Sequence, residues 1–385
     1  MRTPCFALSL LLGAAAHAAG APEPPPESVL ATLPFAKSDE QNRVMVDLAP
    51  EGARPFVMML DTGASDSVIT PGMARQLGVS VRRTKQTPYR RATRLGRDLQ
   101  FWIDTRSSDT ASRTGWEYGL LGGEFLDDYV LEIDFPGKMV RFLDPKKYQV
   151  PEAVDAPEER VAQVVLAGTR ISVPIRLNGH EFSVLLDTGA PMTGVLSGKA
   201  MDGAGIDIGT LPAFGEVGTV LGPMQTSLYE ETDFALAGVG LGLVPLLVSP
   251  KGWYNQGGGN DSVVGYDLLA PFVIRIDYPR KRLWLKRVEP GPIRFNGADY
   301  MLAKQTGAFM SPVPGGHAVW AVTAGSAAAK LGLRVGDVIV SDESLRDRAL
   351  PTDEILRRIL EGKELQVARK QGPIWVDTLL PEEAP

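Results

Sequence analysis

The chain has 385 residues, of which 44% are apolar, so it is long enough for two or three globular domains. Its formal net charge of −6 is mild, and no basic cluster suggests a nucleic-acid partner. The 41 glycines and 30 prolines, with little helical periodicity, favour a turn-rich β protein.

The N-terminal segment has the features of a secretory signal peptide. Arg2 supplies a positive charge, residues 6–16 form an apolar stretch too short to span a bilayer, and a small-x-small cleavage site ends at Ala18. We therefore expect a signal peptide over residues 1–18, a Pro-rich linker over residues 19–34, and a bacterial protein exported to the periplasm or the medium. The alternative is a buried N-terminal helix, which the Pro-rich sequence that follows disfavours.

The chain offers little cysteine or histidine chemistry. Cys5 lies before the cleavage site, so the mature chain would have no cysteine for a disulfide, a zinc site or a nucleophile. His180 and His317 both stand beside glycines in turn-like sequences, which disfavours a Ser-His-Asp mechanism. We therefore expect no metal and no cofactor.

Two segments of the chain are repeated. FVMMLDTGASDSVIT, from Phe56, aligns with FSVLLDTGAPMTGVLS, from Phe182, at an offset of 126 residues. LLGGEFLDDYVLEIDFPGKMVRFL, from Leu120, aligns with VVGYDLLAPFVIRIDYPRKRLWL, from Val263, at an offset of 143 residues. The second copy therefore carries 17 extra residues between its two motifs.

Each copy predicts the same order of elements: a strand, an Asp-Thr-Gly turn, a short helix, several strands, a second short helix, and a strand pair around Asp-(Phe/Tyr)-Pro. In the first copy Thr70 caps the first short helix, which ends at Gly78. We assign the first lobe to residues 35–150, a charged linker to residues 151–160, and the second lobe to residues 161–291.

The pattern changes after the second lobe. Residues 319–341 predict a strand, a short helix, a glycine turn and another strand. Thr352 is predicted to cap a helix that ends at Gly362, with an apolar face formed by Ile355, Leu356, Ile359 and Leu360. Residues 292–385 therefore predict a small α+β unit.

Both Asp-Thr-Gly turns place an aspartate at the end of an apolar strand. One such carboxylate would be an ordinary turn residue, but two homologous lobes related by a pseudo-twofold axis would bring Asp61 and Asp187 together. Two adjacent carboxylates share one proton, because like charges so close cannot both ionise. The pair can then act as one base and one acid on a water molecule between them.

The duplicated motifs resemble those of the pepsin and retropepsin superfamily of aspartic proteases, in particular the bacterial retropepsin-like group with both lobes fused in one chain. The resemblance covers about residues 40–290 and implies two acid-protease β-barrel lobes, a polypeptide substrate and activity as a monomer. It implies that Asp61 and Asp187 are catalytic, with catalytic-loop support from Thr62, Gly63, Ala64, Thr188, Gly189 and Ala190. The second motif would pack behind these loops as a scaffold through Leu121, Gly122, Val264 and Gly265.

Two details bear on how such an enzyme would work. Ala64 and Ala190 stand where pepsins usually carry a hydroxyl residue, so we expect a milder pH optimum than that of a gastric enzyme. Members of the superfamily carry a flap hairpin over the cleft. The candidates are residues 85–100, with Tyr89, and residues 215–229.

The third unit resembles the PDZ domains of bacterial envelope proteases through the run from Gly332 to Ile339. The resemblance implies a groove for a C-terminal peptide, lined by Gly307, Phe309, Ile355 and Ile359. If this groove works, removing residues 300–385 should leave cleavage of a short peptide nearly unchanged. The alternative is a degenerate unit that only packs on the lobes.

The sequence therefore predicts an exported aspartic endopeptidase with a PDZ-like domain that recruits substrates or partners. One alternative is an inactive peptide-binding protein on a protease fold, although such proteins usually lose one of the two aspartates and this chain keeps both. Another is an interaction protein in which the lobes are only a scaffold for the third unit. Replacing Asp61 would separate these classes.

Overall fold

The structure is a computed structural model. It describes residues 20–36, 42–79, 89–103, 119–219, 222–250, 262–288, 294–295, 298–313, 316–340, 350–371 and 374–380. The predicted signal peptide lies outside the described residues. Within the described ranges, no helix is both long enough and apolar enough to cross a membrane.

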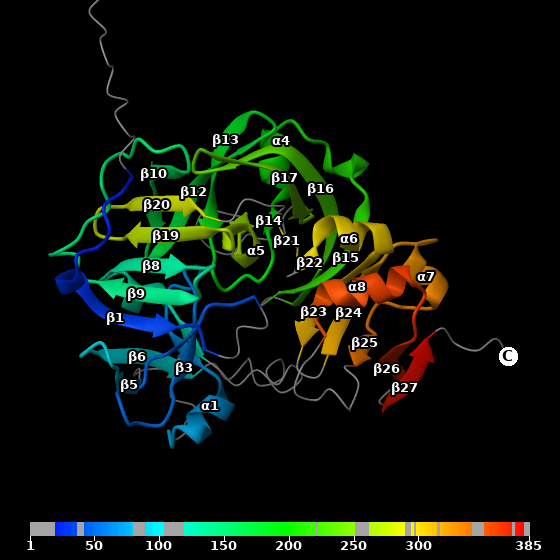
Figure 1. The fold of residues 1–385 in the computed structure, drawn as a ribbon, viewed down its shortest axis with the longest axis horizontal. Helices are drawn as coiled ribbons and strands as arrows, with labels where there is room; N and C mark the ends of the chain where they lie inside the picture. Colours follow the sequence, from blue (N-terminus) through cyan, green and yellow to red (C-terminus); the bar gives the residue numbers. More distant parts are fainter. Residues whose placement is uncertain are drawn as a thin grey trace, which may run out of the picture.

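A six-stranded sheet, which we call the interlobe sheet, joins the two halves of the chain (Figure 1). Its strand order is β1-β9-β8-β19-β20-β10. The four central strands are the two predicted strand pairs around the Asp-(Phe/Tyr)-Pro turns: β8 (Val130–Asp134), β9 (Met139–Leu143), β19 (Phe272–Asp277) and β20 (Arg282–Arg287). The edges are β1 (Val29–Pro34) and β10 (Glu159–Gln163).

Strand β1 corrects the assignment of residues 19–34 to a linker. After a single 3-10 turn, Pro26–Ser28, the chain pairs antiparallel with β9, and Leu33 lies opposite Val140. Leu33 is only 1% exposed, so its burial fixes this segment on the sheet. The Pro-rich composition of the preceding residues concealed a strand that belongs to the fold.

Strands β8 and β19 cross the pseudo-twofold axis of the repeat. They pair antiparallel with Glu132 opposite Arg275, and these two positions are also equivalent in the repeat, at the offset of 143. Equivalent positions that face each other lie on the axis. Arg275 Nε donates to Glu132 Oε2 at 2.6 Å, and both side chains are 1% exposed. A buried ion pair therefore occupies the axis.

The first lobe is built on a sheet of order β2-β3-β7-β4-β6-β5. Its strands are β2 (Met45–Asp47), β3 (Val57–Leu60), β4 (Val68–Ile69), β5 (Tyr89–Ala92), β6 (Asp98–Ile103) and β7 (Gly119–Leu121). The short helices are α1 (Pro71–Gln76) and α3 (Gly123–Leu126). As predicted, the Thr70 side chain caps α1 by accepting the Met73 N–H, and Gly78 follows with φ +71°.

The second lobe repeats this plan in an eight-stranded sheet of order β11-β12-β13-β18-β14-β17-β16-β15. The strands are β11 (Val165–Ala167), β12 (Arg170–Leu177), β13 (His180–Leu186), β14 (Gly194–Leu196), β15 (Ala213–Thr219), β16 (Gly222–Leu236), β17 (Val239–Val248) and β18 (Val263–Val264). The helices are α4 (Gly198–Gly203), the 3-10 turn Ile208–Thr210, and α5 (Tyr266–Leu269).

The extra residues of the second copy lie mainly in a long hairpin, which we call the β15–β16 hairpin. Ile69 of β4 and Val195 of β14 are 126 positions apart, but their strand partners Ile103 and Leu247 are already 144 apart. The added residues therefore lie between α4 and β17, where β15 and β16 pair with each other. The flap candidate at residues 215–229 falls in this hairpin.

The other flap candidate, residues 85–100, falls in its described part within a shorter hairpin, in which β5 pairs antiparallel with β6. Residues 85–88 lie outside the description. Tyr89 begins the short strand β5 and stacks on Phe101, with ring centroids 5.9 Å apart. Phe101 is 1% exposed, so Tyr89 packs on the core of the first lobe and is not placed as a flap aromatic.

The C-terminal unit is α+β, as predicted. Five antiparallel strands follow one another in chain order: β23 (Ala308–Val313), β24 (Gly316–Val322), β25 (Val338–Val340), β26 (Leu365–Gln371) and β27 (Ile374–Leu380). The helices are α6 (Tyr300–Thr306), α7 (Ala327–Leu331) and α8 (Thr352–Leu360). A two-stranded ribbon precedes them, β21 (Arg294–Phe295) with β22 (Ala298–Asp299).

Two details of helix α8 differ from the prediction. Pro351 occupies the N-cap position, and Thr352 is the first helical residue, so the Thr352 hydroxyl does not cap the helix. Leu360 is 43% exposed, so the buried apolar face of the helix consists of Ile355, Leu356 and Ile359. Proline at the entry to a helix fixes the backbone there without a side-chain cap.

The prediction of the side chains that line a peptide groove is wrong. Phe309, Ile355 and Ile359 are between 2% and 5% exposed, so they form the core of the unit and do not line a free groove. Gly307 is the residue at which α6 ends, with φ +68°, and its neighbours begin β23. A left-handed helix end is a normal use of glycine.

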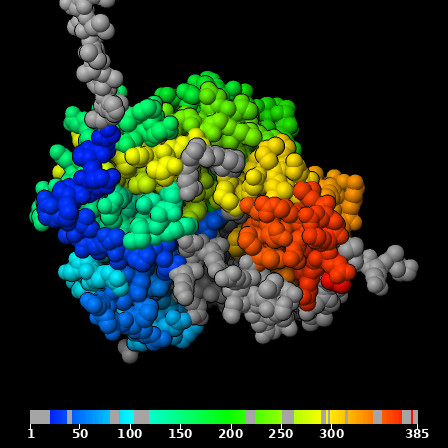
Figure 2. Space-filling model, viewed as in Figure 1, coloured from blue at the N-terminus to red at the C-terminus, as the bar shows by residue number. Residues whose placement is uncertain are grey.

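The core of the C-terminal unit continues into the second lobe. Phe214 of β15 packs against Phe309 and Trp320, with ring centroids 4.6 Å and 5.0 Å away. The same cluster includes Leu228, Leu247, Met192 and Val195 of the second lobe. Figure 2 shows the yellow-to-red C-terminal unit beside the green part of the surface. The unit is therefore packed on the β15–β16 hairpin and near the Asp187 loop.

Candidate active site

The two aspartates stand at equivalent strand ends. Asp61 follows β3 and its N–H donates to Leu121 O at 3.0 Å, while Asp187 follows β13 and its N–H donates to Val264 O at 2.9 Å. In each lobe the neighbouring strand that carries the apolar-apolar-Gly motif therefore holds the start of the Asp-Thr-Gly turn. The repeat places both turns at the boundary between the lobes.

The two threonines cross between the lobes. Thr62 Oγ1 donates to Leu186 O and Thr188 Oγ1 donates to Leu60 O, each at 2.6 Å. Each hydroxyl also accepts the backbone N–H of the other threonine at 3.2 Å. Both threonines are fully buried, so these four hydrogen bonds join one Asp-Thr-Gly turn to the other.

Replacing Thr62 with valine, which keeps the shape, is expected to lower the free energy of unfolding by about 2–4 kcal/mol. The change leaves the Leu186 carbonyl and the Thr188 N–H buried without their partner. Urea denaturation measures the effect. Thr210→Val is the matched control, because its exposed hydroxyl bonds only to the nearby Asp207 carbonyl. Equal stability of the two variants would contradict the crossed hydrogen bonds.

The glycines of the two turns are required because each lies very close to the aspartate of the opposite lobe. A Cβ atom on Gly63 would lie 2.6 Å from Asp187 Cγ, and one on Gly189 would lie 2.7 Å from Asp61 Cγ. No side chain fits at either place. Each aspartate is therefore pressed against the turn of the opposite lobe, and this brings the two carboxyl groups together.

Backbone N–H groups hold one oxygen of each carboxyl group. Asp61 Oδ1 accepts from Gly63 at 2.9 Å and from Ala64 at 3.0 Å. Asp187 Oδ1 accepts from Gly189 at 2.9 Å and from Ala190 at 3.1 Å. The arrangement is nearly symmetric, and it leaves the second oxygen of each group for the partner carboxyl or for a water molecule.

The electrostatics of the pair are not symmetric. Burial, the charge of Asp187 and a hydrogen bond with Asp187 raise the pKa of Asp61 well above its ordinary value. Burial also raises the pKa of Asp187, but the hydrogen bond from Asp61, the turn N–H groups and the charge of Arg43 oppose the increase. The two carboxyl groups therefore share one proton and titrate as a coupled pair, and the positive charge of Arg43 favours the ionised form of Asp187.

Arg43 is a charged neighbour of the pair that sequence reasoning missed. Its side chain is 7% exposed, and burial lowers its pKa to about 10, against the opposing charges of Asp61 and Asp187. It precedes Val44, whose carbonyl accepts the Leu60 N–H at 2.8 Å, so the backbone places Arg43 level with Asp61. Arg43 stands two residues before β2, the strand paired with β3, and no residue near it in the sequence indicated this position.

The second motif packs directly behind the two Asp-Thr-Gly turns. Gly123 N donates to Ala64 O at 2.9 Å, and Tyr266 N donates to Ala190 O at 2.8 Å. A Cβ atom on Gly122 would lie 2.5 Å from the backbone of Asp66, and one on Gly265 would lie 2.5 Å from Ala190 O. Leu121 and Val264 are fully buried beside them. These residues contact the backbone of the turns, and none of their hydrogen bonds given above goes to a carboxyl group of Asp61 or Asp187.

The two histidines lie elsewhere. His180 is the first residue of β13 and is exposed. His317 lies within β24 of the C-terminal unit, 3% exposed, and not in a turn as its glycine neighbours suggested. Burial lowers the pKa of His317 to about 4, so it is neutral at physiological pH.

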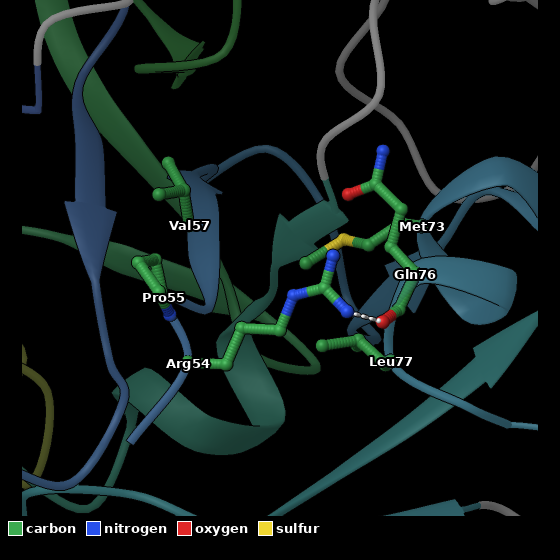
Figure 3. Close-up of a pocket in the computed structure, with 6 residues that line it drawn as sticks. All are labelled: Arg54, Pro55, Val57, Met73, Gln76 and Leu77. Carbon is green, nitrogen blue, oxygen red and sulfur yellow. Dashed lines mark hydrogen bonds between the residues drawn. The ribbon is translucent and has the colours of Figure 1, made fainter. Parts of the chain in front are cut away.

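A surface pocket on the first lobe is separate from the carboxyl pair (Figure 3). It is lined by Arg54, Pro55, Val57, Met73, Gln76 and Leu77, and Arg54 Nη1 donates to the Gln76 carbonyl. Val57 is the first residue of β3, whereas Asp61 follows its last, so the pocket lies at the other end of this strand. No acidic side chain lines it, and we assign it no part in the chemistry.

Comparisons with known proteins agree with this geometry. Residues 173–268 match the family described as "Aspartyl protease", and residues 46–104 match the "gag-polyprotein putative aspartyl protease" family. The first match contains Asp187 and Gly265, and the second contains Asp61. A segment in each half of the chain is thus similar to aspartyl proteases.

Among solved structures, the chain is similar to a retropepsin-like aspartic protease from Rickettsia conorii. The sequences are 20% identical over 33% of this chain and 92% of that chain, with a TM-score of 0.26. No curated protein sequence matches the chain.

Proposed function

We propose that the protein is an aspartic endopeptidase in which Asp61 and Asp187 activate a water molecule against a peptide bond. The observation that carries the proposal is the pairing of two aspartates, Asp61 buried and Asp187 partly buried, by crossed threonine hydrogen bonds between the lobes. An inactive binding protein would not need a carboxyl pair that shares one proton. The matched families support the same reaction class.

We propose that Asp187, whose ionised form Arg43 favours, is the base and that Asp61 is the acid. Ionised Asp187 takes a proton from the water held between the carboxyl groups, and the resulting hydroxide attacks the carbonyl carbon of the substrate. Protonated Asp61 donates a hydrogen bond, and then its proton, to the carbonyl oxygen. Collapse of the tetrahedral intermediate breaks the C–N bond, and the amine leaves with a proton from the pair.

The substrate we propose is a polypeptide bound between the lobes, with the β15–β16 hairpin as the flap. Because both carboxylates come from one chain, we propose activity as a monomer. We also propose export, from the signal-like sequence of residues 1–18. The C-terminal unit is assigned to support of the second lobe and not to capture of peptide termini, because the side chains suggested for that groove are buried.

The rate of cleavage of an unstructured protein is expected to have a bell-shaped pH profile on the acid side of neutrality, unaffected by a chelator. As the pH falls, Asp187 gains a proton and the base is lost. As the pH rises, Asp61 loses its proton and the acid is lost. Burial raises the pKa of both groups. Both limbs of the profile are therefore expected at a higher pH than the pKa of about 3.9 of an ordinary aspartate.

A variant of Arg43 tests the assignment of the limbs. Arg43→Gln removes a cation that opposes the increase in the pKa of Asp187, so the acid limb should move to higher pH while the alkaline limb moves less. Arg90→Gln, at an exposed position of β5, is the control and should leave the profile unchanged. Activity that rises steadily to alkaline pH in the parent would instead indicate a different mechanism.

A further inference from the structure

The segment after the predicted signal peptide is built into the interlobe sheet. Ala21 N donates to Glu159 Oε2 at 2.7 Å, on the edge strand β10. From there the chain passes β19 and β9 on its way to β1, and Figure 1 shows this blue segment along the ends of these strands. The contact with Glu159 joins residues 138 positions apart in the sequence.

Glu159 forms a buried receptor for that backbone nitrogen. The side chain is about 5% exposed, and its Oε2 also accepts Trp284 Nε1 at 2.9 Å. Lys286 Nζ lies 3.3 Å from Oε1 but is 45% exposed. Ala21 itself packs against the cluster that contains Trp284. A carboxylate this deeply buried is stabilised by each additional positive or N–H partner.

The next two residues are held by Arg275, the arginine of the axis pair. Arg275 Nη1 donates to Pro22 O at 3.0 Å, and Nη2 lies 3.2 Å from Glu23 Oε2. Tyr148 Oη donates to the same Pro22 carbonyl at 3.4 Å. The segment therefore closes over a fully buried guanidinium, and its position is fixed at two consecutive points.

The chain is crowded on the other side of Ala21. A Cβ atom on Gly20 would lie 2.6 Å from Glu159 Oε1, so the main chain of Gly20 is pressed against the carboxylate. The sequence Ala18-Ala19-Gly20 is also a small-x-small site, two residues beyond the one that ends at Ala18. A cut after Gly20 would remove the crowded residue and leave Ala21 as the first residue.

We propose that the chain is processed between Gly20 and Ala21, and that the new α-ammonium group of Ala21 is bound by Glu159 in a terminus-binding site. A leader-removing peptidase would hydrolyse the bond: water gives its hydroxyl to the Gly20 carbonyl carbon and a proton to the Ala21 nitrogen. An α-amino group, with a pKa of about 8, is then cationic at neutral pH. One neutral N–H donor is thereby replaced by a charged group beside a buried carboxylate. This inference does not depend on the proposed protease activity.

The first test is the N-terminal sequence and intact mass of the full-length protein after export by a bacterial host. We expect a chain that begins at Ala21. A chain that begins at Ala19, at any other residue, or at Met1 would overturn the proposed processing.

The second test measures the binding site itself. Protein released from a cleavable fusion with Ala21 first is compared by thermal denaturation with protein that keeps Ala19 and Gly20. We expect the form with Ala21 first to melt at least about 2 °C higher. Glu159→Gln should abolish this difference, and Glu158→Gln, the exposed neighbour, should preserve it. Equal melting temperatures, or a difference that survives in Glu159→Gln, would overturn the terminus-binding site.

Discussion

Replacing Asp61 or Asp187 with asparagine is expected to lower the rate of peptide hydrolysis by about 10³-fold or more, because each change removes the acid or the base. The fold should survive, since the asparagine Oδ1 can still accept the two turn N–H groups that the aspartate accepts. Asp61→Asn also removes a buried group whose charged form is disfavoured, so the variant should be at least as stable as the parent at pH 7.

Cleavage of an unstructured protein and circular dichroism together measure these two effects. Asp155→Asn makes the same chemical change at an exposed position and should retain full activity. If either catalytic variant kept near-parental turnover in a folded protein, the shared-proton pair would be the wrong mechanism. If binding of a peptide were retained while hydrolysis was absent even in the parent, the binding-protein alternative would stand.

Removing the chain after Val288 is expected to destabilise the second lobe and to abolish cleavage even of a short blocked peptide. This reverses the expectation drawn from the sequence. The deletion exposes Phe214 and the fully buried Leu247, and loss of burial of two such side chains costs roughly 3–6 kcal/mol. That is a large part of the 5–15 kcal/mol that typically stabilises a protein.

A point variant in the full chain sharpens this prediction. Phe214→Ala removes the ring contacts with Phe309 and Trp320 while both units remain present. We expect a lower melting temperature and weaker short-peptide cleavage, whereas Leu30→Ala, at a half-exposed leucine of β1, should change neither. A truncated protein that stays folded and cleaves the short peptide normally would show that the C-terminal unit gives the lobe no support.

The local sequence of the chain predicted the geometry of the two Asp-Thr-Gly turns. The Asp-Thr-Gly repeat and its glycine partners follow from turn requirements and close approach, which depend on a few neighbouring residues. The Thr70 cap and the strand pairs around Asp-(Phe/Tyr)-Pro are equally local. These features could be predicted because residue type alone limits what the backbone can do there.

The features that were missed depend on contacts between distant segments. No residue near Arg43 in the sequence indicates that its side chain lies beside the two aspartates. The Pro-rich sequence before Val29 likewise does not indicate that a strand follows. The helix α8 has an apolar face whether it lines a groove or fills a core, so its sequence could not decide between them. The burial of Phe309 depends partly on Phe214 of the second lobe, which packs beside it and lies far from it in the sequence.

The ion pair between Glu132 and Arg275 limits how the two halves of the chain can assemble. Two copies of the first half, joined as an isologous dimer about the same axis, would place two glutamates face to face in the sheet, and two copies of the second half would place two arginines there. Either homodimer would bury two like charges at a site that now holds opposite ones, at a cost of several kcal/mol. The pairing of the first half with the second is therefore favoured over the pairing of either half with a copy of itself. Neither half alone should form a stable symmetric homodimer about this axis unless Glu132 or Arg275 is also replaced.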